Sequence, residues 1–191
     1  MAENEITNSK IKKFDNPERL KEMPTSFILE KAKLNEPELM IDYGAGTGIF
    51  SKEVYQAYPK SKIMACDISE KMIEWMQTHV AIEYPENIIP ILMQDNRIPL
   101  EDGIADFLFM LNLHHELPNP IKALNEASRL LKPQGVIAIC DWKKEEVGKG
   151  PSFDERVTIS EVEKHLREAN FKEIEVYDDM KMHFLFIARK Q

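Results

Sequence analysis

The stretch MIDYGAGTGIF, residues 40–50, decides how this chain folds. An apolar run leads to an acid, Asp42, and three glycines follow at two-residue spacing, Gly44, Gly46 and Gly48. Glycine tolerates left-handed backbone and lets another group approach the main chain closely. The pattern therefore predicts a strand that ends in a tight turn against which a ligand lies.

The spacing of the glycines separates the common uses of such a turn. A dinucleotide-binding turn needs the pattern GxGxxG, but Ile49 stands where its third glycine would be. A phosphate-binding P-loop is excluded because no Gly-Lys-Ser/Thr follows. A tight turn without a ligand is the alternative. Asp67 favours a ligand, because it ends the next apolar run and a carboxylate there can accept both hydroxyls of a ribose.

Short apolar runs alternate with helical patterns along the chain. The runs ELMIDYG, KIMACD, NIIPILMQ, ADFLFMLNL and GVIAICDW are typical of strands buried on both faces. The final runs FKEIEVYDD and MHFLFIARK predict an antiparallel pair. We therefore predict an α/β fold, a doubly wound, Rossmann-like sheet of seven mostly parallel strands with an antiparallel last strand.

Apolar stripes and capping residues indicate where the helices lie between these strands. Helices are expected over 26–34, 47–58, 69–80, 119–131 and 160–169. Ser69 and Asn119 are the expected N-caps of two of them, and Ser160 with Glu163 is the expected capping box of the last. The predicted organisation is a polar lead-in and helix over 1–34, followed by a single domain over 35–191.

Composition narrows the class of protein. The 191 residues are 43% hydrophobic and carry a net charge of −8, which argues against a nucleic-acid partner. No apolar run approaches the roughly 20 residues that cross a bilayer, and the first residues do not read as a secretory signal. We therefore expect a cytoplasmic protein without a membrane partner. Cys66 and Cys140 belong to no CxxC pair, so we expect buried, reduced thiols and no metal site.

Four segments in order carry a resemblance to a known family. They are IDYGAGTG, ACDISEKMI, QDNRIPLEDGIADFLFMLNLHHEL and NEASRLLKPQGVIAICDW. Together they resemble the motifs of class I S-adenosylmethionine-dependent methyltransferases, especially the small type 11 enzymes, which include the menaquinone and ubiquinone C-methyltransferases. The resemblance covers residues 35–142 strongly. It implies S-adenosylmethionine as cofactor, no metal, and methyl transfer by direct displacement to an acceptor that we expect to be a small molecule.

The same resemblance implies a set of cofactor-binding residues. The glycine turn would lie against the methionine end of the cofactor, Asp67 would hold the ribose, and Ile68 and Met72 would pack on the adenine. In the family a carboxylate five residues before a proline takes the adenine amine. Gln94 holds that position here and Asp95 follows, and the sequence leaves the choice between them open. The full set is Asp42, Gly44, Ala45, Gly46, Gly48, Asp67, Ile68, Met72, Gln94, Asp95, Asn96 and Asn112.

Candidate catalytic residues follow the fourth and fifth strands. His115 matches a family histidine and Glu116 replaces the next one, so His115 is either a general base or a packed imidazole. A metal site at His114 and His115 is disfavoured, because neighbours on a strand point to opposite faces. Trp142 is the expected apolar wall of the acceptor pocket.

The charged residues near Trp142 have two possible roles. Lys143 or Arg156 would grip an anionic group on the acceptor, or the charges form an ordinary solvated face. The resemblance also implies that Phe14–Arg19 folds over the pocket and meets the segments after strands four and five.

Two rival functions remain at this point. One is a non-catalytic module of the same fold that binds the cofactor or a partner protein. The other is a nicotinamide-dependent oxidoreductase, which Ile49 opposes. The methylated atom and the oligomeric state are open.

Overall fold

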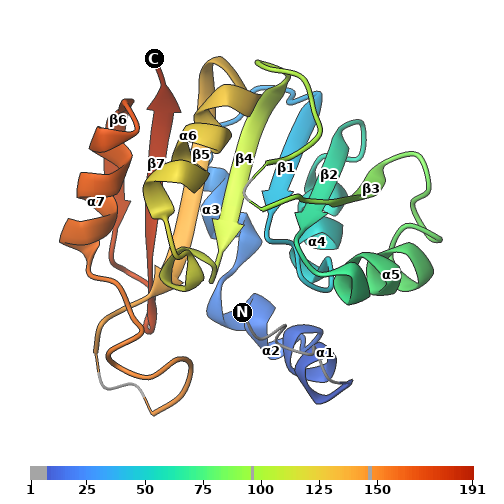
Figure 1. Cartoon of the computed structure of the whole chain (residues 1–191), viewed down its shortest axis with the longest axis horizontal. Coiled ribbons are helices and arrows are strands. Elements are labelled where there is room, and N and C mark those ends of the chain that lie inside the picture. Colours follow the sequence, from blue (N-terminus) through green and yellow to red (C-terminus); the bar gives the residue numbers. More distant parts are fainter. Residues whose placement is uncertain (1–7, 96, 146–147) are drawn as a thin grey trace.

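The computed structural model describes residues 8–95, 97–145 and 148–191, and these residues form one seven-stranded sheet (Figure 1). The spatial order is β3-β2-β1-β4-β5-β7-β6. The strands are β1 (Leu39–Tyr43), β2 (Lys62–Asp67), β3 (Ile88–Leu92), β4 (Ala105–Leu111), β5 (Leu131–Trp142), β6 (Phe171–Tyr177) and β7 (His183–Lys190). Strands β1 to β5 pair in parallel, and β7 is antiparallel to both neighbours. The predicted sheet is confirmed.

Helices cover both faces of this sheet. They are α1 (Asn8–Phe14), α2 (Glu18–Glu22), α3 (Thr25–Ala32), α4 (Ile49–Ala57), α5 (Glu70–His79), α6 (Pro120–Leu130) and α7 (Ile159–Glu168). Neighbouring residues of β1 divide between the faces: Met40 packs with α3 and α4, and Ile41 packs with α6 and α7. Side chains alternate along a strand, so a strand buried on both faces reads as a continuous apolar run.

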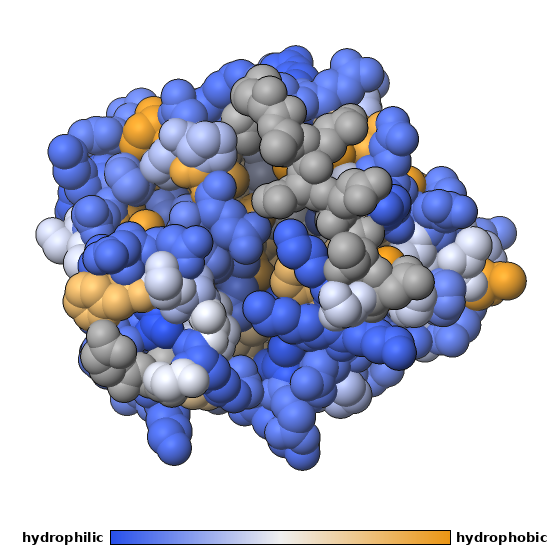
Figure 2. Space-filling model, turned by 60° about the horizontal axis from the view of Figure 1, so that its bottom comes forward, coloured by the Kyte–Doolittle hydropathy of each residue, from blue (hydrophilic) through white to orange (hydrophobic). Residues whose placement is uncertain are grey.

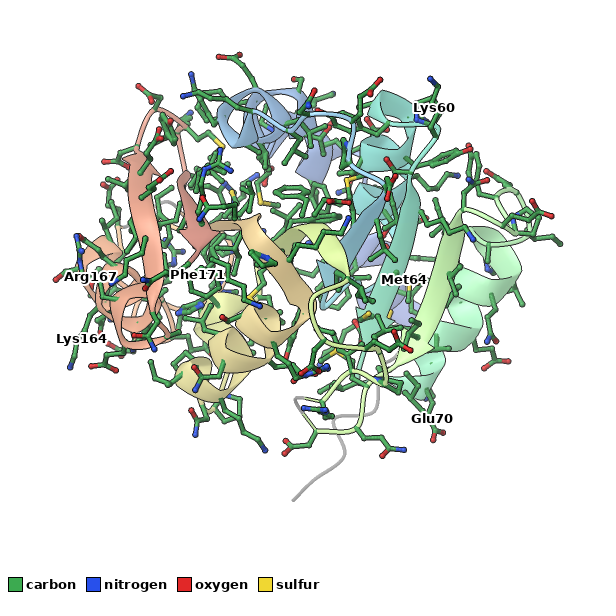
Figure 3. The ribbon with its side chains drawn as sticks, turned by 90° about the horizontal axis from the view of Figure 1, so that it is seen from above. Lys60, Met64, Glu70, Lys164, Arg167 and Phe171 are labelled. Atoms are coloured by element: carbon green, nitrogen blue, oxygen red, sulfur yellow. The ribbon has the colours of Figure 1, made fainter. Side chains whose placement is uncertain are left out.

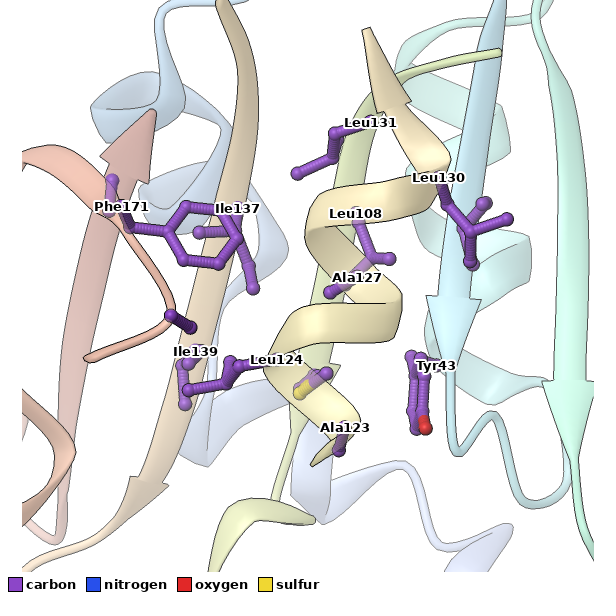
Figure 4. Close-up of a cluster of buried hydrophobic side chains, with 14 of the residues drawn as sticks. Tyr43, Leu108, Ala123, Leu124, Ala127, Leu130, Leu131, Ile137, Ile139 and Phe171 are labelled. Atoms are coloured by element: carbon purple, nitrogen blue, oxygen red, sulfur yellow. The ribbon is translucent and has the colours of Figure 1, made fainter. Parts of the chain in front are cut away.

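The core beneath α6 shows how sequence periodicity becomes packing. Leu124, Ala127 and Leu130 lie on one stripe of α6 and are fully buried against the sheet (Figure 4). Asn119 caps the helix by accepting the backbone N–H of Lys122, as expected. Because α6 is fixed on the sheet, the segment between β4 and α6 is held at both of its ends.

The carboxyl ends of the parallel strands form one edge of the molecule, at the bottom of Figure 1. The short helices α1 and α2 lie at this edge, as does the loop that follows β5. Figure 2 brings the edge forward and shows apolar surface between hydrophilic residues. Ligands of open α/β sheets bind at this edge.

Two local expectations were wrong. The capping box of α7 is formed by Thr158 and Glu161 rather than by Ser160 and Glu163, so the helix begins at Ile159. On α7, Lys164 and Arg167 project from the outer side, whereas Phe171, the first residue of β6, points into the core (Figure 3).

The second wrong expectation concerns the polar lead-in, where no helix was expected before residue 26. Residues 8–22 contain α1 and α2, which are too short and too polar to show an apolar stripe in the sequence. Ser69 caps α5 as expected, and Cys66 and Cys140 are buried free thiols as expected. Within the described residues, no helix is long and apolar enough to cross a membrane.

Candidate functional site

The three glycines of the turn after β1 all have left-handed backbone, and each meets a different environment. A Cβ on Gly44 would come within 2.7 Å of the Leu113 side chain, and one on Gly48 within 3.2 Å of Met76. A Cβ on Gly46 would meet nothing within 4 Å. Gly44 and Gly48 are therefore required by packing as well as by φ, whereas Gly46 borders open space.

Asp67 lies beside this turn at the end of β2. One carboxylate oxygen accepts the backbone N–H of Gly46 at 2.8 Å, and the other accepts that of Ser69 at 2.9 Å. Burial raises the pKa of Asp67 above its ordinary value, although these backbone donors oppose the shift. The carboxylate is thus oriented between the glycine turn and α5, at the place predicted for a ribose.

Asp42 is buried one residue before the end of β1. It accepts the hydroxyl of Ser51 in α4 at 2.6 Å, which ties the strand to the helix after the turn. Burial raises the pKa of Asp42 to about 7, and the nearby charge of Asp67 adds to the increase. In the structure Asp42 therefore supports the turn by holding the end of β1 to α4.

The residues expected around the adenine are placed unequally. The Ile68 side chain is 68% exposed beside Asp67, so it is accessible to a base, while Met72 is 1% exposed and packed inside. Gln94 is exposed and pairs through its backbone with Arg97.

The rest of this group lies around the neighbouring strand ends. Asp95 forms an ion pair with Lys122, which leaves Gln94 as the better candidate for the adenine amine. Asn96 lies outside the described residues. Ala45 is buried in the turn. Asn112, after β4, has left-handed backbone and a buried Oδ1 without a hydrogen-bond partner. Such an orphaned oxygen is costly unless a ligand satisfies it.

His115 lies in a 3-10 turn, His114–Glu116, after the end of β4, so the strand alternation used against a metal pair does not apply here. Its Nδ1 is 2.7 Å from Oδ1 of Asp141, a fully buried carboxylate in β5. Asp141 also accepts the backbone N–H groups of His115 and Trp142. Burial alone would lower the pKa of His115, but the hydrogen bond and charge of Asp141, with Glu116 and Glu155, raise it.

His114 has the opposite environment. Its Nε2 lies 3.1 Å from Nδ1 of His165 in α7, and burial lowers its pKa to about 4. No group of three potential metal ligands occurs among the residues that the structure describes. His114 is therefore a packed, neutral imidazole, and His115 is the member of the pair with a carboxylate partner.

Trp142 lies under the loop that follows β5. A Cβ on Gly150 would approach its ring to 2.9 Å, Arg156 stacks 5.6 Å from the ring centroid, and His183 lies 4.2 Å from it. The apolar wall expected from Trp142 is thus covered by its own loop. Both ring nitrogens of His183 are buried without partners, and burial lowers its pKa to about 4.

The expectation that Lys143 or Arg156 grips an anion is contradicted. Arg156 is buried and donates to the backbone carbonyl groups of Pro151, Lys143, Glu145 and Lys149. Lys143 pairs with Asp178 at 2.8 Å. These cations hold the loop together, a role that the sequence does not reveal because the partners are main-chain oxygens.

Interactions link the three segments that were expected to meet at the acceptor pocket, and the pocket itself stays a prediction. His115 and Trp142 share the carboxylate of Asp141, and Arg19 of α2 interacts electrostatically with Glu116 and Asp42. Sequence reasoning missed Asp141 as the partner of His115. The available signal was an acid near the end of β5, as in β1 and β2.

Comparisons with known proteins bear on the family and the fold of this chain. A family model described as "Methyltransferase domain" matches residues 41–139. A solved SAM-dependent methyltransferase from Aquifex aeolicus is 34% identical, with a TM-score of 0.90 over 97% of this chain and 100% of that one. A solved putative type 11 methyltransferase from Sulfolobus solfataricus is 21% identical, with a TM-score of 0.73 over 88% of this chain and 92% of that one. At that identity the second likeness concerns the fold alone.

Curated relatives match over a shorter region. The demethylmenaquinone methyltransferase of Chlamydia pneumoniae is 30% identical over 53% of this chain and 43% of its own length. A malonyl-(acyl-carrier protein) O-methyltransferase of Methylococcus capsulatus is 29% identical over 53% of this chain and 36% of its own length. The match thus spans less than half of each of these relatives.

Proposed function

This chain belongs to the methyltransferase-domain family, and on that premise we propose that it transfers a methyl group from S-adenosylmethionine to a small-molecule acceptor by direct displacement. Residues 35–191 form the catalytic unit in this proposal, and residues 8–34 lie against it. When bound, S-adenosylmethionine supplies a sulfonium methyl group whose carbon the nucleophile of the acceptor attacks, with S-adenosylhomocysteine as the leaving group.

One observation carries the assignment of the cofactor site. Gly46, in the turn after β1, borders open space. The carboxylate of Asp67, at the carboxyl end of the neighbouring strand β2, lies 2.8 Å from the backbone nitrogen of Gly46. An oriented carboxylate beside an open glycine turn fits a ribose, since its oxygens can accept two hydroxyl groups. Ile68 offers an apolar surface to the adenine, and the orphaned oxygen of Asn112 fits a donor such as the ammonium group of the methionine end.

We propose that His115 serves as the general base. Its Nδ1–H is donated to Asp141, which leaves the Nε2 lone pair to accept the proton of an O–H or N–H acceptor. The raised pKa makes Nε2 a stronger base, and Glu116, 3.7 Å from it, helps to stabilise the imidazolium before the proton passes to solvent. Trp142 contributes by anchoring the loop over this group.

The function is tested with radiolabelled S-adenosylmethionine and a panel of small phenols, amines, thiols and carboxylic acids. We expect label in at least one O–H or N–H acceptor, and we expect His115→Asn to slow transfer roughly 100-fold or more, the usual contribution of a positioned base. A matched control is His114→Asn, which changes the neighbouring imidazole. Binding of S-adenosylhomocysteine without transfer to any acceptor class would favour the non-catalytic module instead.

A further inference from the structure

Arg19 is the second residue of α2, and its side chain reaches the turn region of the site. Its Nη1 donates to the backbone carbonyl of Phe14 at 2.8 Å. The guanidinium carbon lies 5.1 Å from the ring centroid of Phe50 and 5.5 Å from that of Phe14. Phe50 is in the first turn of α4, two residues after Gly48. The guanidinium is therefore held between the N-terminal helices and the glycine turn.

The charge of Arg19 is not balanced by a direct ion pair among the residues that the structure describes. Burial lowers its pKa, and the charges of Asp42, Glu22 and Glu116 act against that shift. Each of these carboxylates has another neighbour: Asp42 accepts from Ser51, Glu22 pairs with Lys149, and Glu116 faces His115. The Arg19 side chain is half-buried and lies against two aromatic rings, and a guanidinium at a ligand edge without an ion pair among the described residues can take an anionic ligand.

We infer that Arg19 binds the carboxylate of the methionine moiety of the cofactor. This inference rests on the proposed function. The carboxylate is the only anion of S-adenosylmethionine, and the planar fork of arginine matches it in a bidentate manner. α2 then holds the cofactor from the N-terminal side through the charge of Arg19.

The competing explanation is that Arg19 only fastens α2 to α4 through its contacts with Phe14 and Phe50. Loss of such a fastening lowers stability and affects every ligand of the site alike. A carboxylate ligand role makes the effect depend on the ligand. The two explanations are therefore separated by a ligand that lacks only the carboxylate.

The experiment is a calorimetric titration with S-adenosylhomocysteine and with decarboxylated S-adenosylhomocysteine. We expect Arg19→Gln to weaken binding of S-adenosylhomocysteine roughly 10- to 100-fold, the range for a charged hydrogen-bonded pair, and to leave the decarboxylated ligand within about twofold. Arg19→Lys should restore part of the affinity.

The matched control is Lys31→Gln. Lys31 in α3 also lies over two aromatic rings, Phe27 at 5.2 Å and Tyr177 at 5.3 Å, and we expect this variant to bind both ligands as the wild type does. Equal losses for both ligands in Arg19→Gln, or an unchanged affinity for S-adenosylhomocysteine, would overturn the inference. A wild-type protein that binds neither ligand would instead contradict the proposed function.

Discussion

Asp67 and Asp106 each accept hydrogen bonds from two backbone N–H groups, at opposite ends of the sheet. They differ in whether a cation neutralises the carboxylate. Asp106, near the start of β4, accepts the backbone N–H groups of Glu38 and Leu39 and pairs with Lys132 at 2.7 Å. Partial burial would raise the pKa of Asp106, but Lys132 and the backbone donors lower it overall. Asp67 accepts the backbone N–H groups of Gly46 and Ser69, no cation pairs with it among the described residues, and burial raises its pKa.

The contrast separates a structural carboxylate from a binding one. At the amino end of the strands the charge is neutralised within the protein, so it contributes to the fold. At the carboxyl end the charge is oriented but left without a cation among the described residues, which costs stability and leaves hydrogen-bonding capacity for a ligand.

The largest effect is expected at the glycine turn. Gly46→Val places a branched side chain in the open space of the site, so we expect S-adenosylhomocysteine binding to weaken by about 3 kcal/mol or more. Gly103→Val is the control, because Gly103 also has positive φ and no contact closer than 4.0 Å. Calorimetry should show a loss for Gly46→Val only. An equal loss in both variants would mean that strain, and not ligand space, explains the result.

The two aspartates provide the next comparison. Asp67→Ala should weaken S-adenosylhomocysteine binding by about 1.5–3 kcal/mol, the contribution of hydrogen bonds to a charged group. Asp106→Ala should lower the melting temperature and leave the affinity unchanged, because its carboxylate faces backbone at the other end of the sheet. Calorimetry and thermal denaturation of both variants check this. If the two substitutions lowered affinity alike, the contrast between the two ends would be wrong.

Sequence reasoning succeeded where the signal is local. The acid-glycine turn and Asp67 lie on consecutive strand ends, so strand alternation alone brings them together. The pairing of His115 with Asp141 depends on how β4 and β5 align, and the burial of Arg156 depends on carbonyl groups that sequence patterns do not mark. Arg19 reaches the site through helices too short to be predicted.

The paired imidazole gives a smaller, local effect. Asp141→Asn removes the charge that opposes the burial of His115, so the pKa of His115 should fall. Glu116→Gln should lower it less, because Glu116 has the weaker influence on this imidazole. Titration of the side-chain nitrogens by NMR measures both changes. A pKa of His115 that does not move in Asp141→Asn would remove the base assignment.

The smallest effect concerns stability against pH. The pKa of Asp42 is raised to about 7 by burial, above the ordinary value near 3.9 in an unfolded chain. The stabilising contribution of such a carboxyl group is fully present when the pH is below its unfolded pKa. It is lost as the pH rises through its folded pKa of about 7. Asp42 should therefore cost about 1 kcal/mol of unfolding free energy between pH 6 and pH 8.

Asp42→Asn keeps an oxygen for Ser51 and removes the titration, so its stability should fall less over this interval. Urea denaturation at the two pH values measures the difference between the variant and the wild type. Parallel losses in the two proteins would show that Asp42 does not titrate in this range.

A crystal structure of the complex with S-adenosylhomocysteine tests the assignment of the carboxyl-end site most directly. We predict that both ribose hydroxyls lie within hydrogen-bond distance of Asp67, that the homocysteine carboxylate lies on Arg19, and that the sulfur faces His115 Nε2. A ligand bound away from Asp67, or a sulfur more than about 10 Å from both His115 and Trp142, well beyond reacting distance, would contradict it.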